Sequence, residues 1–342
     1  MSEGAPPDVI EIGTDVLANE RVFRRAVMEA CQPIIIRGAV SNWPVVRAAQ
    51  TSLEALRAYL ARFAMSRRAE AFVGDSVIAG RYTYTDRLDG FNFERVEMDL
   101  LGAFDQIVAN AGRAGSPTVY MGSAETEAFL PGFSAENRTP AVPARIGPRI
   151  WIGNASNISC HNDTFDNIAC VIAGQRTFTL YPPDAVADLY VGPVDYTMAG
   201  RPISLASGAV GQEARYPRFA GAERRASVAR LMPGDALYLP KLWWHQVEAT
   251  APVNVLINYW WDGWSIGPDA PDTTMLLAMI AIAERPPAER AAWKAMFDHY
   301  VFRSEGHPLA HMPEARHGIL GPLRDGNYGL IRARVMQLLR DI

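Results

Sequence analysis

The stretch that decides the fold of this chain contains His161 and Asp163, followed by two β-rich runs. The stretch reads HNDTFDNIACVIAGQRTFTLYPP and covers residues 161–183. Residues 168–172 and 176–181 are short runs rich in β-branched and aromatic side chains, and Gly, Pro, Asn and Asp punctuate them. This pattern is typical of strands and not of helices.

Similar runs continue on both sides of this stretch. Residues 118–121, 150–152, 236–239 and 253–260 are short and apolar, and turn-forming residues separate them. Many short strands at such spacing indicate an all-β sandwich or barrel. Residues 191–228 are rich in Gly, Pro and Arg and lack periodicity, so they are expected to form a long connection between strands.

The flanks of this β-rich region have a different texture. Before it, three consecutive isoleucines at 34–36 predict a buried strand, while residues 19–31, 51–63 and 98–110 predict helices. Thr51 and Glu54 have capping-box spacing for the second of these helices. After Gly267, three further helices are expected, over residues 273–284, 288–302 and 328–341.

The predicted fold class is therefore mainly β with helices, in the α+β class. We expect an N-terminal α/β lead-in over residues 1–116, a β core over residues 117–267 and a C-terminal helical region over residues 268–342. A chain of 342 residues with 49% hydrophobic and 20% charged residues has the composition of a globular protein.

Charge and cysteine content restrict the class of partner and compartment. A formal net charge of −4 argues against nucleic acid as the partner. The three cysteines form no CxxC pair, which favours reduced thiols and a cytoplasmic location. The start of the chain lacks the pattern of a signal peptide, and its longest apolar run, residues 275–283, is too short to span a membrane.

His161 and Asp163 are the sharpest candidates for chemistry. Two residues apart on a strand, they are expected to project to the same face, whereas Cys160 should face away. A third ligand from a distant strand completes a facial triad of two histidines and one carboxylate, which suits non-haem Fe(II). His245, at the end of the run PGDALYLPKLWWH (233–245), is the candidate. The alternative is a histidine that packs on the preceding tryptophans.

The other histidines lie near the C-terminus and are expected to be surface or interface residues. Two of them have the i,i+4 spacing of a helical metal clamp, but Pro308 between them favours a loop. The four residues are His299, His307, His311 and His317.

In their order along the chain, these motifs resemble the JmjC-type, cupin-like 2-oxoglutarate oxygenases. Within this family the sequence resembles the branch that holds the asparaginyl hydroxylase of hypoxia-inducible factor and its bacterial relatives. The resemblance rests on residues 161–183 and 233–249, on NVLINYWWDG (254–263) and on PIIIRGAVSNWPVV (33–46). It implies a double-stranded β-helix (jelly-roll, cupin) core. The implied activity is that of an Fe(II)- and 2-oxoglutarate-dependent dioxygenase that hydroxylates a C–H bond of a protein side chain or a small molecule.

The resemblance also implies roles for single residues. His161, Asp163 and His245 are implied to be the iron ligands. The positions implied to bind the cosubstrate 2-oxoglutarate are Tyr120, Asn167, Arg176 and Asn258.

Two positions depart from the pattern of the family. Arg176 stands where relatives carry a lysine that pairs with the far carboxylate of 2-oxoglutarate; arginine keeps the charge but presents it in a planar fork. Ile158 stands where relatives often carry threonine or serine.

Relatives in this family dimerise through C-terminal helices, so the resemblance implies a homodimer. The apolar stripe of Met275, Leu276, Met279 and Ile282 agrees with this, although packing against the barrel is the alternative. For the activity, the alternative is a non-catalytic or non-2-oxoglutarate metal-binding cupin that serves as a ligand-binding scaffold. Metal cupins of other classes usually carry an HxH motif, which this sequence lacks.

Overall fold

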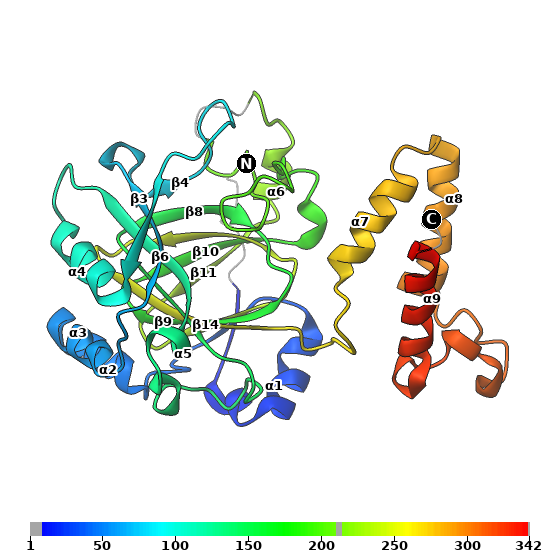
Figure 1. The fold of residues 1–342 in the computed structure, drawn as a ribbon, viewed down its shortest axis with the longest axis horizontal. Coiled ribbons are helices and arrows are strands. Elements are labelled where there is room, and N and C mark those ends of the chain that lie inside the picture. The colour runs from blue at the N-terminus through cyan, green and yellow to red at the C-terminus, as the bar shows by residue number, and fades with distance from the viewer. Residues whose placement is uncertain (1–8, 210–213, 341–342) are drawn as a thin grey trace, which may run out of the picture. The chain divides into compact units, whose positions relative to one another are not determined.

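Two sheets face each other in the computed structural model, which describes residues 9–209 and 214–340 (Figure 1). The smaller sheet has the order β11 (Ser227–Leu231), β10 (Arg176–Tyr181), β13 (Trp244–Ala249), β8 (Ser156–His161) and β4 (Arg81–Tyr82). The larger sheet has the order β1 (Ile10–Ile12), β2 (Ile34–Ile36), β12 (Ala236–Leu239), β9 (Asp166–Ala173), β14 (Asn254–Trp261), β7 (Arg149–Gly153), β6 (Thr118–Glu125), β3 (Arg68–Gly74) and β5 (Glu94–Asp99).

The alternation of side chains in the larger sheet separates two cores. In β9, Ile168, Cys170 and Ile172 belong to the core on the outer face, while Ala169 and Val171 belong to the core between the sheets. Because successive strand residues point to opposite faces, both faces of this strand are apolar, as a strand buried on both sides requires. The same alternation places polar side chains of β9 and β14, Asn167 and Asn258, in the space between the sheets.

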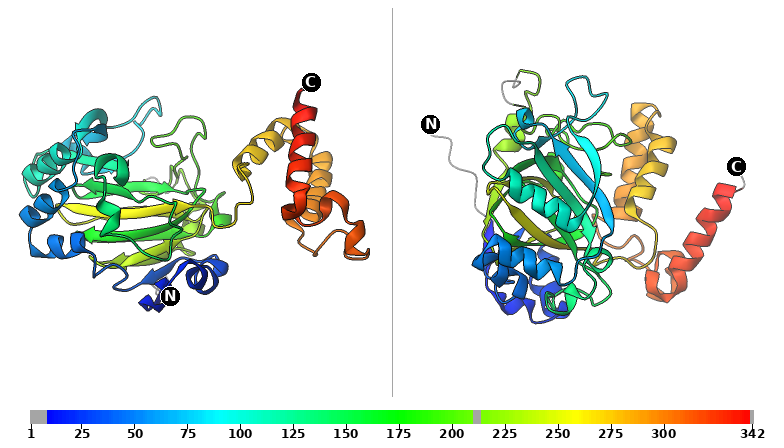
Figure 2. Two further views of the ribbon diagram at one scale, coloured as in Figure 1. Left: turned by 60° about the horizontal axis from the view of Figure 1, so that its bottom comes forward. Right: turned by 60° about the vertical axis from the view of Figure 1, so that its left-hand side comes forward.

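Helices cover part of the outer face of the larger sheet, the face that points away from the smaller sheet (Figures 1 and 2). They are α2 (Pro44–Thr51), α3 (Leu53–Ala61) and α4 (Leu100–Asn110), and each buries an apolar face against the outer core. The helix predicted over residues 51–63 begins at Leu53, not at Thr51. Ser52 is its N-cap and accepts a hydrogen bond from the Ala55 N–H at 3.1 Å, so the capping box predicted with Thr51 is wrong.

Most predicted elements of the core have counterparts here, and the alternating β-rich pattern is confirmed as a jelly-roll core in an α+β fold. The strands over 176–181 and 236–239 have the predicted bounds. The missed strands include β3 and β5. They read RAEAFVG and ERVEMD, and β5 forms the edge of the larger sheet, where charged residues replace the apolar run that reveals a buried strand. The shorter helices are α1 (Glu20–Ala26), α5 (Thr126–Phe129) and α6 (Phe219–Glu223).

The chain divides into two compact units, residues 1–263 and residues 264–342. The second unit contains α7 (Pro271–Ile282), α8 (Pro287–Phe297) and α9 (Tyr328–Arg340), and residues 298–327 between α8 and α9 include short 3-10 and π-helical segments. Asp269 ties its start to α9, since it pairs with Arg332 at 3.0 Å and accepts a hydrogen bond from the Tyr328 hydroxyl. Among residues 9–209 and 214–340, no helix combines the length and apolar character of a membrane span.

Candidate metal centre and adjoining cavity

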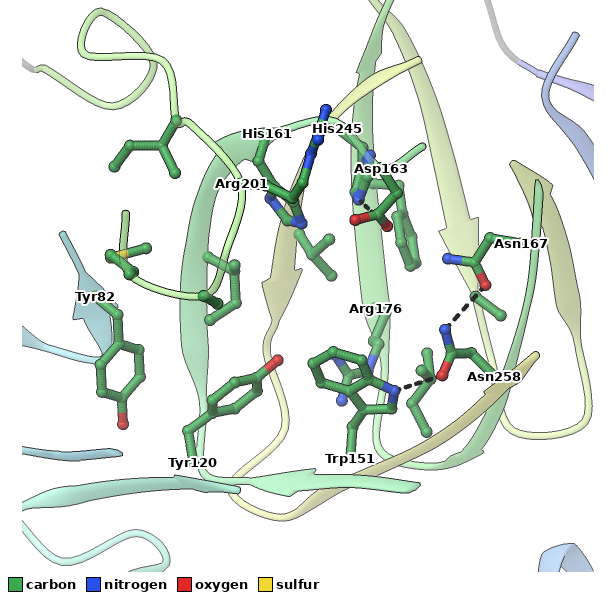
Figure 3. A pocket seen from close by; sticks show the side chains of 18 of the residues that line it. Tyr82, Tyr120, Trp151, His161, Asp163, Asn167, Arg176, Arg201, His245 and Asn258 are labelled. Carbon is green, nitrogen blue, oxygen red and sulfur yellow. Dashed lines mark hydrogen bonds and ion pairs between the residues drawn. The ribbon is translucent and has the colours of Figure 1, made fainter. Parts of the chain in front are cut away.

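A cavity lies between the two sheets of the first unit, and the candidate residues gather in it (Figure 3). It takes residues from β6, β7, β9 and β14 of the larger sheet and from β8, β10 and β13 of the smaller one. All seven residues singled out from the sequence line it: Tyr120, His161, Asp163, Asn167, Arg176, His245 and Asn258.

Three of these residues form the single cluster of potential metal ligands found among the described residues. His161, Asp163 and His245 each offer a ligand atom, and these atoms all lie within 4.8 Å of one another. His161 ends β8 and pairs in register with His245 near the start of β13, so adjacent antiparallel strands bring them together. The rings lie 4.3 Å apart between centroids, and His245 Nε2 is 3.8 Å from Asp163 Oδ2.

A β-bulge aims His161 into the cavity. Val247 pairs with Ile158 and His245 with His161, so three steps along β8 match two steps along β13. Strict alternation from Ile158, which lines the cavity, would turn His161 away. The extra residue restores His161 to the cavity face and sends Cys160 into a separate apolar cluster, on the side away from the candidate metal ligands.

Backbone carbonyls fix both imidazole rings. His161 Nδ1 lies 2.9 Å from the Ser159 carbonyl oxygen, and His245 Nδ1 lies 3.0 Å from that of Trp243. A carbonyl can only accept, so each Nδ1 carries a proton, and in a neutral ring of this tautomer Nε2 has the lone pair for a ligand. Burial, with the neighbouring His161, lowers the pKa of His245 to about 4, so this ring is neutral at pH 7.

The geometry of Asp163 differs from the expectation that it shares a strand with His161. The strand β8 ends at His161, and Asp163 lies in the loop that follows. The turn before His245 holds this loop instead, because the Leu242 N–H donates to the Asp163 carbonyl at 2.7 Å. Leu242 adopts a positive φ of 68° to do so.

A partly buried salt bridge also holds the same turn. Lys241 Nζ lies 2.5 Å from Asp262 and 3.5 Å from Asp166. Asp166 is 1% exposed and also accepts a hydrogen bond from the Tyr238 hydroxyl at 3.0 Å. The two segments that carry Asp163 and His245 are therefore tied to each other.

Arg176 is a buried cation that no carboxylate of the described residues neutralises. It is 4% exposed at the start of β10, and its Nε has no hydrogen-bond partner. Burial lowers its pKa, although an arginine stays protonated at physiological pH. A buried charge without a partner is costly, so this guanidinium fits a site for an anion.

Tyr120 brings its hydroxyl into the same cavity as Arg176 (Figure 3). Burial raises the pKa of Tyr120 to about 12, and so the phenol keeps its proton and can donate a hydrogen bond. Ile158 also lines the cavity and supplies no hydrogen bond there.

Two asparagines and a tryptophan form a chain of hydrogen bonds along one wall. Trp151 Nε1 donates to Asn258 Oδ1 at 2.6 Å, and Asn258 Nδ2 donates to Asn167 Oδ1 at 3.2 Å (Figure 3). The parity of β9, β14 and β7 places all three on the inner face. Sequence reasoning found the asparagines but missed Trp151, which shows no motif of its own.

Arg201, which belongs to the long connection predicted over residues 191–228, also lines the cavity. Its Nε donates to the Asn162 carbonyl at 3.0 Å and its Nη2 to Asn162 Oδ1 at 2.6 Å. Next to it, His161 forms a β-bridge with Ile203, and the Ser204 N–H donates to the Cys160 carbonyl at 2.7 Å. This part of the predicted connection over residues 191–228 therefore lines the cavity beside the candidate metal ligands, while residues 210–213 lie outside the described chain.

A second hollow opens beside the cavity and shares one wall with it. Its lining includes ion pairs between Arg149 and Glu125 at 2.8 Å and between Arg95 and Glu70 at 2.6 Å. The Arg149 guanidinium also lies 5.8 Å from the centroid of a ring of Trp260. The wall common to both hollows consists of Phe72, Tyr120, Trp151, Met198, Ala199 and Trp260.

The C-terminal histidines take no part in this site. His307 and His317 stack with centroids 4.3 Å apart, and their Nε2 atoms contact the Leu320 and Met312 carbonyl oxygens. They belong to the second compact unit.

Comparison with known proteins identifies one family match and several relatives. The sequence profile described as "Cupin-like domain" matches residues 19–265. Human "Bifunctional peptidase and (3S)-lysyl hydroxylase JMJD7" is 25% identical over 264 residues, which cover 68% of this chain and 77% of the relative. "Jumonji C domain-containing protein 5" of Drosophila melanogaster is 24% identical over 250 residues, covering 70% and 57% of the two chains.

Human "HSPB1-associated protein 1" is 31% identical over 157 residues, which cover 44% of this chain and 31% of the relative. The alignment thus spans about a third of the length of the HSPB1-associated proteins.

Proposed function

The chain belongs to the cupin-like domain family, and from that premise we propose that it is an Fe(II)- and 2-oxoglutarate-dependent oxygenase. Its reaction in this proposal is hydroxylation of a C–H bond in a protein side chain or a small molecule. The observation that carries the proposal is the pairing, in one cavity, of a three-ligand metal cluster with a buried arginine that lacks a counterion.

The donor set suits Fe(II). His161 and His245 offer neutral nitrogens, and Asp163 offers one carboxylate, which is the facial triad of non-haem Fe(II) oxygenases. Such a triad leaves coordination positions for other ligands. Fixed Nδ1 contacts hold the rings in the tautomer that metal binding requires.

The cavity beyond the triad suits a dicarboxylate with one end far from the metal. Arg176 supplies a charge that can bind a carboxylate through two parallel hydrogen bonds, and Tyr120 adds a phenolic donor. We propose that both bind the far carboxylate of 2-oxoglutarate and that Asn167 and Asn258 shape the remainder of its site. Arginine in place of the family's lysine then preserves the charge, and its second donor offsets the hydroxyl that Ile158 lacks.

When bound, iron and 2-oxoglutarate activate O₂ so that one oxygen atom enters a substrate C–H bond and the other enters succinate, with release of CO₂. The residues of the chain position these reactants. Apolar side chains such as Phe72, Met198 and Ile203 line the same cavity and restrict water around the reacting centre.

A protein side chain is the substrate class that we favour over a free small molecule. The second hollow meets the metal cavity along one wall and carries charged pairs and aromatic faces, which suit a polypeptide that inserts one side chain. The printed name of human JMJD7 describes a lysyl hydroxylase, so a protein substrate has a precedent in a relative.

The proposal is tested by loading the protein anaerobically with Fe(II) and titrating with 2-oxoglutarate. A visible charge-transfer band from the chelated 2-oxo acid is expected, and admission of O₂ should then yield succinate. Saturable metal binding without a band would indicate the alternative, a metal-binding cupin that uses another ligand. Failure to bind Fe(II) would indicate a ligand-binding scaffold without metal chemistry.

We further propose that the C-terminal helical region, residues 268–342, forms a homodimer interface, as a region separate from the lead-in (1–116) and the core (117–267). Its exposed apolar residues support this, because α7 buries none of its side chains. The exposed residues include Met275, Leu276, Met279 and Ile280 in α7 and Leu330, Leu338 and Leu339 in α9.

We also propose that the protein is located in the cytoplasm.

Substituting Ile280 with glutamate should shift the protein from dimer to monomer. Ile280 is 85% exposed, so the new charge costs little in the monomer but is buried in a helix-mediated dimer. Sedimentation velocity at micromolar concentration measures the change. The matched control is Val77→Glu in the first unit, where the side chain is 84% exposed. Equal sedimentation of both variants and the wild type would contradict the interface.

A further inference from the structure

We propose that Trp151 is a positioning residue that sets the polarity of the cosubstrate site through Asn258 and Asn167. The proposal rests on the proposed 2-oxoglutarate function and adds to it a residue with no assigned role. Its basis is the chain of hydrogen bonds from the Trp151 indole to Asn258 and from Asn258 to Asn167.

The chemistry of the indole fixes the direction of every bond in this chain. An indole N–H can only donate, so the Asn258 atom at 2.6 Å from Trp151 Nε1 must be the carbonyl oxygen. The amide nitrogen of Asn258 then faces Asn167, and the Asn167 atom at 3.2 Å must be its carbonyl oxygen. An asparagine alone can present either end of its amide, but two asparagines behind an indole cannot.

Packing holds the indole in place. Trp151 meets Trp260 edge to face with centroids 5.5 Å apart, and it lies 6.2 Å from the Tyr120 ring on another side. Gly122 sits against the same ring, because a Cβ at that position would come within 2.8 Å of it. Gly122 and Ser123 form a β-bulge between β6 and β7, so the strand itself makes room for the tryptophan.

The consequence is a free N–H group on the cavity side of Asn167. With its oxygen engaged by Asn258, Asn167 turns its amide nitrogen into the cavity (Figure 3). Within the described residues nothing accepts a hydrogen bond from this nitrogen. Arg176 and the Tyr120 hydroxyl are donors in the same cavity, so this part of the site offers donors to an anion.

Loss of the indole N–H removes the constraint. Asn258 and Asn167 can then reverse together, and Asn167 presents a carbonyl oxygen to the ligand in place of an N–H. An acceptor facing a carboxylate loses a charge-assisted hydrogen bond and adds repulsion. The metal ligands do not depend on this chain, because backbone carbonyls and the Leu242 N–H hold them.

A double-mutant cycle tests the proposal on the full-length protein loaded with Fe(II). Trp151→Phe keeps an aromatic ring and removes the N–H, while Asn167→Ala removes the amide that is being oriented. Each single variant should raise the Kd for 2-oxoglutarate, read from the charge-transfer band, by about 10-fold, in line with the loss of one hydrogen bond to a charged group. The double variant should be no weaker than Asn167→Ala alone, and Fe(II) affinity should stay at the wild-type value in all three.

Additive losses in the double variant, or an unchanged Kd in Trp151→Phe, would show that Trp151 only packs and would overturn the proposal. A parallel loss of Fe(II) affinity would do the same. If Trp151→Phe fails to fold by circular dichroism, Asn258→Leu breaks the same chain, and its cycle with Asn167→Ala should give the same non-additive result. Absence of the band in the wild type overturns the 2-oxoglutarate function itself, whereas a wild-type band with additive variants overturns the role of Trp151 alone.

Discussion

Replacement of Asp163 by alanine should abolish the charge-transfer band and lower turnover of 2-oxoglutarate to background. Asp163 is the single carboxylate of the ligand cluster, and its side chain lies 3.8 Å from His245 Nε2. Without it, two neutral imidazoles remain to hold a divalent cation. Substitution of a residue that only hydrogen-bonds to a metal ligand typically lowers metal affinity by about 10–100-fold, so removal of the ligand itself should lower it by at least that much.

Calorimetric titration of the apo protein with Fe(II) under anaerobic conditions measures this effect directly. Asp184→Ala is a matched control, because Asp184 has an exposed carboxylate that pairs with Arg225 on the protein surface. The control should bind Fe(II) like the wild type. A variant at Asp163 that still binds Fe(II) at wild-type affinity and still forms the band would place the metal elsewhere.

The sequence predicts the cluster itself but gives the wrong reason for part of it. Alternation along a strand was expected to align Asp163 with His161, yet β8 ends at His161. A bulge within β8 turns His161 inward, and the Leu242 N–H holds the loop that carries Asp163. Bulges and turns of this kind depend on which strands pair and in what register, which the local pattern of one strand does not contain.

The same limit explains which cavity residues were found. Runs rich in β-branched, aromatic and other apolar residues in β9, β10, β12 and β14 predict strands, and side chains of all four belong to the cores of the two sheets. Trp151 is one of eight tryptophans and follows Ile150 in an ordinary short strand, so nothing local marks it. Its function in the site comes from β14, whose Asn258 pairs with Arg149 of β7 across the larger sheet. Such a relation appears only once the sheet order is known.

Replacement of Arg176 by methionine should have opposite effects on the empty and the ligand-bound protein. Arg176 is 4% exposed, its Nε has no partner, and burial lowers its pKa, so the folded state pays for an uncompensated cation. Methionine has a similar length and no charge. We expect the free energy of unfolding of the apo protein to rise by about 1–3 kcal/mol, as in other replacements of buried charges by apolar residues.

The same substitution should remove most of the affinity for 2-oxoglutarate. Loss of one partner of a buried charge pair costs about 2–5 kcal/mol, which corresponds to a Kd at least 30-fold higher. Arg176→Lys is the control, since it keeps the charge and gives up the second hydrogen bond. Its Kd should lie between those of the wild type and the methionine variant.

These two effects predict that the order of thermal stability reverses on addition of the cosubstrate. A ligand at 1,000 times its Kd stabilises the folded state by about 4.1 kcal/mol, which exceeds the gain expected for the empty variant, and a variant that has lost most of its affinity gains much less. In thermal melts of the metal-loaded protein, Arg176→Met should therefore melt above the wild type without 2-oxoglutarate and below it with 2-oxoglutarate. A lower melting temperature of the variant in both conditions would mean that Arg176 supports the fold. In that case other groups of the protein already stabilise the charge of Arg176, and its burial would not indicate an anion site.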